Sequence, residues 1–117
     1  MQNRRRVGTN YENLAAKYLQ TLGYQIVEQN YYSRYGEIDL IAIHQGYLVF
    51  IEVKYRTNER KGNPLEAVTL SKQKTISKCA VCYIREHHLE DCAVRFDVVG
   101  ILEKKIKVVS NAFDFVS

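Results

Sequence analysis

The chain has 117 residues, of which 46% are hydrophobic and 26% charged, and 17 Lys and Arg against 13 Asp and Glu give a net charge of +4. This length fits one domain, and the composition excludes a disordered tail, a collagen-like fibre and a coiled coil. No apolar run approaches the roughly 18 residues of a membrane span, and the basic N-terminus lacks the apolar stretch of a signal peptide. We therefore expect one cytoplasmic domain over residues 1–117. Its basic excess is equally consistent with a polyanionic partner and with solubility alone.

The first predicted element is a helix over residues 10–22. Thr9 followed by Glu12 fits a capping box, in which two side chains satisfy free amides at a helix N-terminus. Gly23 stands where a helix-ending residue with positive φ belongs. The predicted apolar face, at helical spacing, consists of Leu14, Ala15, Tyr18, Leu19 and Leu22.

Strands are predicted to follow. Residues 24–28 are short and apolar-rich, and the polar segment 30–36 is predicted to be a loop. Alternating side chains then occupy residues 37–44 and 47–56, on either side of Gln45-Gly46. Two alternating runs around a glycine-containing turn indicate a β-hairpin.

The second half of the chain predicts another helix and two more strands. After a polar loop at 57–63, residues 64–68 are predicted to form one helical turn, and Thr69 opens a long helix that ends near His87. Strands at 94–101 and 106–109 follow, turning at Glu103-Lys104. The order α-β-β-β-α-β-β predicts the α/β class, with a mixed β-sheet flanked by helices. The inward face of the second long helix is predicted to be Ile76, Cys79, Ala80, Tyr83 and Ile84.

Cys79 and Cys82 have the spacing of a metal-binding or redox pair. A structural zinc ion needs four ligands, and only Cys92, His87 and His88 are near in sequence. The pair also falls within a helical apolar pattern, where cysteine behaves as a small hydrophobic residue. We favour the packing role.

The predicted hairpin brings two carboxylates together. A turn centred between Gln45 and Gly46 pairs Asp39 with Glu52 across the strands and, one step along the same face, Glu37 with Lys54. Like charges opposite one another destabilise a sheet, and a divalent cation would relieve their repulsion. Oxygen ligands on a rigid scaffold suit Mg²⁺ or Mn²⁺. The alternative is a solvated face held by cross-strand ion pairs.

Residues outside the hairpin extend this candidate site. Glu12 lies beside the apolar face of the first helix and would point into the same cleft, unless it serves only the capping box. Lys72 continues the inward face of the second long helix. Arg34 and Arg56 flank the hairpin among interleaved tyrosines, a composition that contacts phosphates and stacks bases. Ordinary half-buried packing is the alternative for at least half of these tyrosines.

An acid on one strand, Glu-x-Lys on the next and a Glu on a preceding helix resemble the PD-(D/E)xK nuclease superfamily, which has a restriction-endonuclease-like fold. The chain more closely resembles the YraN-like family of bacterial proteins, whose predicted nuclease fold is similar to that of archaeal Holliday-junction resolvases. The segments that carry the resemblance span nearly the whole chain: Gly8 with Glu12, Ala15 and Ala16; Gly23-Tyr24; Gly36 to Ile41; Phe50 to Arg56; Gly62 with Pro64 and Glu66-Ala67-Val68; Lys72; Arg95 to Val99; and Asn111-Ala112-Phe113.

By this resemblance, Asp39 and Glu52 are metal ligands, Lys54 is the catalytic lysine and Glu12 is a further ligand or a residue that organises the metal site. It also implies that Gln73 stands near a helix glutamine of related nucleases. The sequence departs from the superfamily name in having Ile38, and not Pro, before Asp39. The set expected to contact nucleic acid is Arg34, Arg56, Lys72 and Gln73.

The sequence thus predicts an Mg²⁺- or Mn²⁺-dependent nuclease that acts on nucleic acid, with DNA favoured and with branched DNA such as junctions among the candidate substrates. Cutting both strands of a junction would require two sites and therefore a homodimer. Two alternatives use the same surface without chemistry: a nucleic-acid-binding module that needs no metal, and a structural or interaction domain with no salt-dependent binding to nucleic acid.

Overall fold

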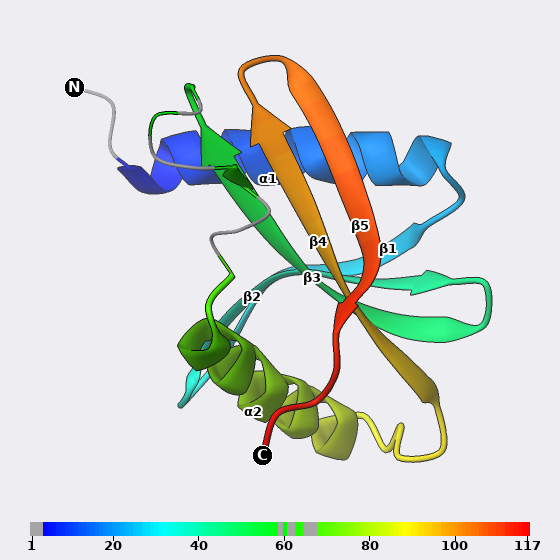
Figure 1. Cartoon of the computed structure of the whole chain (residues 1–117). Helices are drawn as coiled ribbons and strands as arrows, with labels where there is room; N and C mark the ends of the chain where they lie inside the picture. Colours follow the sequence, from blue (N-terminus) through cyan, green and yellow to red (C-terminus); the bar gives the residue numbers. More distant parts are fainter. Residues whose placement is uncertain (1–3, 59, 61–62, 65–67) are drawn as a thin grey trace.

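The computed structural model describes residues 4–58, 60, 63–64 and 68–117, with side chains from residue 10 onward. Five strands form one sheet in the order β1-β2-β3-β4-β5, and one helix covers each face (Figure 1). The α/β class and the predicted order of helices and strands are confirmed. The elements are α1 (Arg4–Thr21), β1 (Gln25–Ser33), β2 (Gly36–His44), β3 (Tyr47–Arg56), α2 (Leu70–Glu86), β4 (Ala93–Leu102) and β5 (Lys105–Phe113).

The sheet is mixed because only β3 and β4 run parallel. Parallel neighbours need a crossover, and α2 lies within the connection between them. The β2–β3 turn has positive φ at Gln45 (52°) and Gly46 (82°), as the tight hairpin turn requires. Its predicted register is confirmed over the five pairs from His44↔Tyr47 to Leu40↔Ile51.

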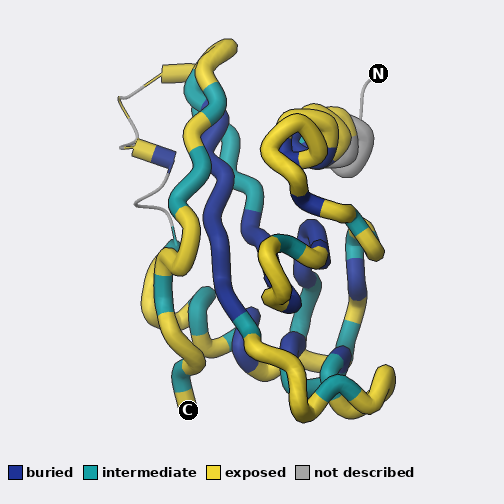
Figure 2. Tube along the Cα trace, turned by 90° about the vertical axis from the view of Figure 1, so that its right-hand side faces the viewer, coloured by how far each residue is buried: buried dark blue, intermediate teal, exposed yellow. Residues whose placement is uncertain are grey.

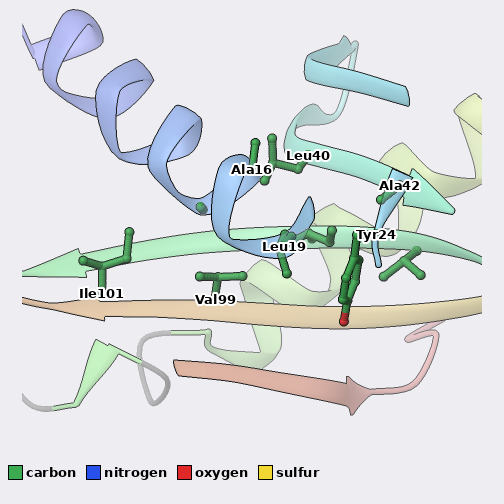
Figure 3. Close-up of a cluster of buried hydrophobic side chains, with 10 residues drawn as sticks. Ala16, Leu19, Tyr24, Leu40, Ala42, Val99 and Ile101 are labelled. Atoms are coloured by element: carbon green, nitrogen blue, oxygen red, sulfur yellow. The ribbon is translucent and has the colours of Figure 1, made fainter. Parts of the chain in front are cut away.

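The core has two halves, one under each helix. The α1 half gathers Ala15, Ala16 and Leu19 against the middle strands, where small residues let the helix lie close to the sheet (Figure 3). The α2 half contains Ile76, Cys79, Ala80 and Tyr83, so most of the predicted inward face of α2 is confirmed and Cys79 packs as a core residue. No helix in the described part of the chain is long and apolar enough to cross a membrane.

The predicted face of the first helix is only partly right. Leu14, Tyr18 and Leu22 are 44%, 36% and 46% exposed, and α1 presents a mostly exposed surface (Figure 2). The helix also begins at Arg4, so Thr9 lies within it and the predicted capping box is wrong. Packing through the alanines turns the helix so that Glu12 faces inward, where it is 9% exposed.

Several strand boundaries also differ from the prediction. The expected loop at 30–36 is largely strand, because Asn30 adopts φ 55° within β1 and Tyr31 packs edge-on against Tyr83. β5 continues four residues past the predicted end at Val109, to Phe113. In the segment expected to form a helical turn, Pro64 lies in a short 3₁₀ turn, whereas residues 65–67 lie outside the described part, as do 59 and 61–62 of the preceding polar loop.

A buried polar network joins four parts of the fold that are distant in sequence. Asp97, with no exposed surface, accepts two hydrogen bonds from Arg95 (2.9 and 2.8 Å), one from the Tyr24 hydroxyl (2.6 Å) and one from the Asn111 amide (2.9 Å). Arg95 also contacts Nδ1 of His44 at 2.8 Å. The network therefore joins the α1–β1 connection, the hairpin turn, β4 and β5.

Replacing Asp97 with Ala should destabilise the fold by about 3–5 kcal/mol, because Arg95 would stay buried without its counter-charge. Urea denaturation measures the free energy of unfolding. Asp91→Ala, at an exposed position after α2, is the matched control and should change stability by less than about 0.5 kcal/mol. Equal effects of the two substitutions would contradict a structural role for the network.

Candidate metal centre

The candidate site begins where β2 separates from β3. The two strands leave one another toward opposite sides of the molecule (Figure 1), and their ladder ends at Leu40↔Ile51. Asp39, the residue before Leu40, has no backbone pairing with β3. Its side chain makes the contact instead: Oδ2 accepts a hydrogen bond from the Val53 amide at 2.8 Å. The ladder thus stops one residue short of the predicted Asp39–Glu52 pair, and Asp39 reaches β3 through its side chain.

The backbone is irregular at Asp39 on both strands. Between β1 and β2 the described pairs pass from Gln29↔Leu40 to Tyr31↔Ile38, which leaves Asn30 facing Asp39. Asn30 has φ 55°. Ile38 consequently packs in the α2 half of the core, whereas Leu40 and Ala42 lie in the α1 half. The alternation of side chains along β2 is therefore interrupted at Asp39.

Three acids meet at this break. One oxygen each from Glu12, Glu37 and Asp39 lie within 4.8 Å of one another. Glu12 comes from the middle of α1, and its Oε2 is buried with no hydrogen-bond partner. The prediction that Glu12 points toward Asp39 is confirmed. The predicted pairing of Glu37 with Lys54 is wrong. Because the β2–β3 ladder ends at Leu40↔Ile51, Glu37 lies with Glu12 and Asp39 instead.

Glu52 and two lysines form the other part of the site. Glu52 is 5% exposed, and its Oε2 has no hydrogen-bond partner. Lys54 Nζ lies 3.9 Å from Oε1 of Glu52, and Lys72 Nζ, from the first turn of α2, lies 3.6 Å from Oε2. These are charge contacts at distances longer than a hydrogen bond. Lys72 was predicted to face inward and to contact nucleic acid; the structure places its ammonium group beside Glu52.

The acids raise one another's proton affinity. Burial raises the pKa of Glu52 to about 9; the charge of Asp39 adds to this rise, while Lys72 and Lys54 oppose it. Burial also raises the pKa of Glu12 to about 8, and the charges of Asp39 and Glu37 add to the effect. At neutral pH the centre lacks enough positive charge to keep all its carboxyls ionised.

The residues present fit a hard divalent cation. The donors are carboxylate oxygens, with no sulfur or imidazole among the clustered acids. Two buried oxygens, on Glu12 and Glu52, have unused acceptor capacity, and Asp39 is fixed by a backbone amide. The tight three-acid cluster contains Glu37 and omits Glu52, so Asp39 is the member common to both parts of the centre.

The other residues expected to contact nucleic acid lie outside the acid cluster. Arg34 is exposed in the β1–β2 turn, where its Nη2 donates to the Tyr35 hydroxyl at 2.6 Å. Arg56 ends β3, two residues beyond Lys54. Gln73 donates from Nε2 to the Val68 carbonyl at 3.1 Å and so holds the chain entering α2.

A pair of stacked tyrosines was missed at the sequence level. The rings of Tyr11 and Tyr55 lie 3.7 Å apart, centroid to centroid, at an interplanar angle of 17°. Tyr11 precedes Glu12 and Tyr55 follows Lys54, so the stack joins α1 to β3 directly beside the acids. An aromatic residue next to each site residue was the available signal, but it gave no indication that the two would meet.

Comparison with known proteins gives a family without an assigned activity. Residues 11–101 match the model of a family described as "Uncharacterised protein family UPF0102". A "UPF0102 protein" of Lachnoclostridium phytofermentans is 49% identical over 113 residues, which cover 96% of both chains. A "UPF0102 protein" of Rhodococcus opacus is 46% identical, covering 92% of this chain and 95% of its own, and one of Trichlorobacter lovleyi is 44% identical, covering 92% and 90%.

Stability should fall as the pH rises from about 5 to about 9. The folded state holds protons on Glu52 and Glu12 more tightly than the unfolded state, in which both ionise near 4.5, so raising the pH through this window removes stability. Mg²⁺ or Mn²⁺ should raise the melting temperature more at pH 8 than at pH 5.5, because ionised carboxylates bind the cation. Thermal unfolding with and without metal measures both effects.

Glu52→Gln should raise the metal-free stability at pH 8 by about 1–3 kcal/mol, or roughly 4 °C per kcal/mol, and reduce the metal response. Glu90→Gln, at an exposed position, is the control. A stability that rises with pH over this window, or an equal metal response in both variants, would count against the centre.

Proposed function

The chain belongs to the UPF0102 family, and we propose that it is a metal-dependent nuclease that hydrolyses phosphodiester bonds of nucleic acid, with DNA as the favoured substrate. The observation that carries this proposal is the position of Asp39. A backbone amide anchors it between two buried carboxyls, Glu12 and Glu52, each with an oxygen left unused. Most buried polar groups in native proteins have a partner in the protein, in ordered water or in a bound ion.

Asp39, Glu52 and Glu12 would hold Mg²⁺ or Mn²⁺, and Glu37 joins them as a fourth candidate ligand. When bound, the cation supplies a water of lowered pKa and charge stabilisation at the scissile phosphate. The protein's own contribution is to fix the carboxylates. The Val53 amide holds Asp39 to the central strand, and burial holds Glu12 and Glu52 in a setting of low dielectric.

Two lysines supply the positive charge that phosphate chemistry requires. Lys54 lies beside Glu52, on the same face of β3, and is 25% exposed. In this proposal Lys54 orients the attacking water and neutralises a phosphate oxygen. Lys72, which is 35% exposed, lies on α2, and its ammonium group is near Glu52. It would contact the same phosphate or a neighbouring one. The ammonium groups are accessible while Glu52 is not, which suits contact with a substrate.

A second candidate function is a nucleic-acid-binding module without catalysis. It is favoured by a group of basic and aromatic side chains that is independent of the carboxylates. The guanidinium of Arg34 lies 4.8 Å from the centre of the Tyr35 ring, and Nζ of Lys78, from α2, lies 5.6 Å from it. Such exposed cations next to an aromatic ring suit phosphate contact and base stacking.

Cleavage assays test the nuclease proposal. Single-stranded, double-stranded, flap and four-way DNA should be incubated with Mg²⁺ or Mn²⁺, and at least one should be cut. Asp39→Asn and Lys54→Met should each lower the rate by about 10²-fold or more, because each removes charge from the reacting centre. Lys17→Met, at an exposed position on α1, should leave the rate unchanged. Activity that persists in both centre variants would refute the assignment.

Binding measured without metal separates the two candidate functions. For a module, the Kd should rise with salt and be the same in EDTA as in Mg²⁺. Arg34→Ala should reduce the slope of log K against log salt by about 1, because one phosphate contact is lost. Arg85→Ala, in the last turn of α2, is the control. No salt dependence in the wild type would exclude both candidate functions and leave a structural role.

A further inference from the structure

A cavity of about 610 Å³ lies at the end of β3, just beyond the candidate centre. Its size falls within the range of pockets that hold a small ligand, roughly 300–1,000 Å³. The described lining contains two guanidinium groups and no carboxylate, so its charge suits an anion. The lining residues are Tyr55, Arg56, Thr57, Asn58 and Arg60.

Arg56 is held in place with one donor unused. The Glu103 amide donates to its carbonyl at 3.1 Å, and its own Nη1 donates to the Tyr55 carbonyl at 2.8 Å. Its Nε is buried and has no hydrogen-bond partner. A buried donor left unsatisfied costs about 1–3 kcal/mol, so the hydrogen bonds of this guanidinium within the described part of the chain are incomplete.

The cavity is aligned with the centre along the strand. Residues two apart on a strand share a face, so Glu52, Lys54 and Arg56 present an acid, an ammonium and a guanidinium in a row. Lys54 and Arg56 are about 7 Å apart along the chain. Successive phosphates of one nucleic-acid strand would thus meet first the lysine and then the arginine.

An aromatic ring completes the cavity. Tyr55 also lines it; its ring lies on the α1 face of β3, opposite to the face of Lys54 and Arg56, and is braced by its stack on Tyr11, so a ligand would contact the ring and the guanidinium around the end of the strand. Stacking of a base on an aromatic side chain contributes about 1–3 kcal/mol without regard to sequence. Guanidinium groups and a braced ring together match the two parts of a nucleotide, its phosphate and its base.

We propose that this cavity is a subsite for one unpaired nucleotide of the strand that the candidate centre cuts, with its phosphate on Arg56 and Arg60 and its base against Tyr55. The proposal rests on the proposed nuclease function and adds a substrate class: nucleic acid with a single-stranded segment next to the cleavage point. A pocket of this size accepts one nucleotide, whereas a base pair within a duplex has no unpaired face to offer it.

Fluorescence anisotropy with labelled DNA tests the subsite in EDTA, so that binding is measured without cleavage. The probes are a blunt duplex, the same duplex with a five-nucleotide 5′ or 3′ overhang, and the single strand. The wild type should bind at least one overhang probe about tenfold more tightly than the blunt duplex. Arg56→Gln and Tyr55→Leu should each remove most of this preference. Tyr55→Leu keeps the net charge and should leave the affinity for the blunt duplex unchanged, whereas Arg56→Gln should weaken overhang binding more than blunt-duplex binding.

Arg56→Lys and Arg85→Gln complete the set. The lysine keeps the charge and should retain part of the overhang preference, while the exposed Arg85 should be neutral. Thermal unfolding of each variant checks that it is folded. No overhang preference in the wild type, or an equal loss on blunt and overhang probes in Arg56→Gln, would overturn the subsite.

Cleavage by the same variants separates the two proposals. Arg56-dependent overhang preference without Mg²⁺-dependent cleavage would support the subsite and refute the nuclease. Cleavage that depends on Asp39, with the same KM for an overhang substrate in the wild type and in Arg56→Gln, would support the nuclease and refute the subsite.

Discussion

The candidate site depends on one electrostatic constraint: carboxyls are gathered where water cannot solvate their charge. Glu12 and Glu52 are 9% and 5% exposed, and each has a buried oxygen without a partner. Folding alone does not favour such an arrangement, because burial penalises the ionised form and the charge of Asp39 adds to the penalty. The two lysines near Glu52 offset only part of it, at 3.6 and 3.9 Å and in partial contact with solvent. The fold therefore maintains a local deficit of positive charge that a divalent cation would satisfy.

The fold creates this constraint by interrupting a sheet. Asp39 occupies a place where β2 has left β3, opposite an Asn30 held at φ 55°, and its carboxylate takes over the hydrogen bond of a lost ladder pair. The start of β2 is fixed by the close approach of Gly36 to α2, where an added Cβ would meet Thr75 Cγ2 at 2.8 Å. With its beginning pinned to α2 and its end paired to β3, β2 bends between them. At this bend Asp39 lies close both to Glu12, from α1 on one face of the sheet, and to Glu52, whose side chain points to the α2 face.

The sequence predicts the regular parts of this arrangement and misses the irregular ones. Gln45-Gly46 fixes a turn type and hence a register, so the approach of Asp39 toward Glu52 was predictable from local chemistry alone. The register does not indicate where the pairing ends, because that depends on tertiary contacts such as the packing of Gly36 against α2; Glu37 was therefore assigned to the wrong neighbour. The first helix failed for a similar reason. Exposed Leu14 and Tyr18 fit an apolar stripe as well as the alanines do, and only close packing against the sheet distinguishes them.

Two buried acid sites in one small sheet show why the centre at Asp39 is interpreted as functional and the one at Asp97 as structural. Asp97 lies at a register shift between β4 and β5, and Asp39 lies where the β2–β3 ladder ends; each is across from an asparagine with positive φ, Asn111 or Asn30. Asp97 has its full set of partners: a guanidinium, a hydroxyl and a backbone amide, with no oxygen left over. Asp39 accepts one hydrogen bond, from the Val53 amide, and the acids Glu12 and Glu37 gather around it. An asparagine with positive φ thus faces a buried aspartate at both sites. At Asp97 the partners come from within the chain and the carboxylate holds the fold together; at Asp39 the proposed divalent cation would supply the positive charge that the chain does not.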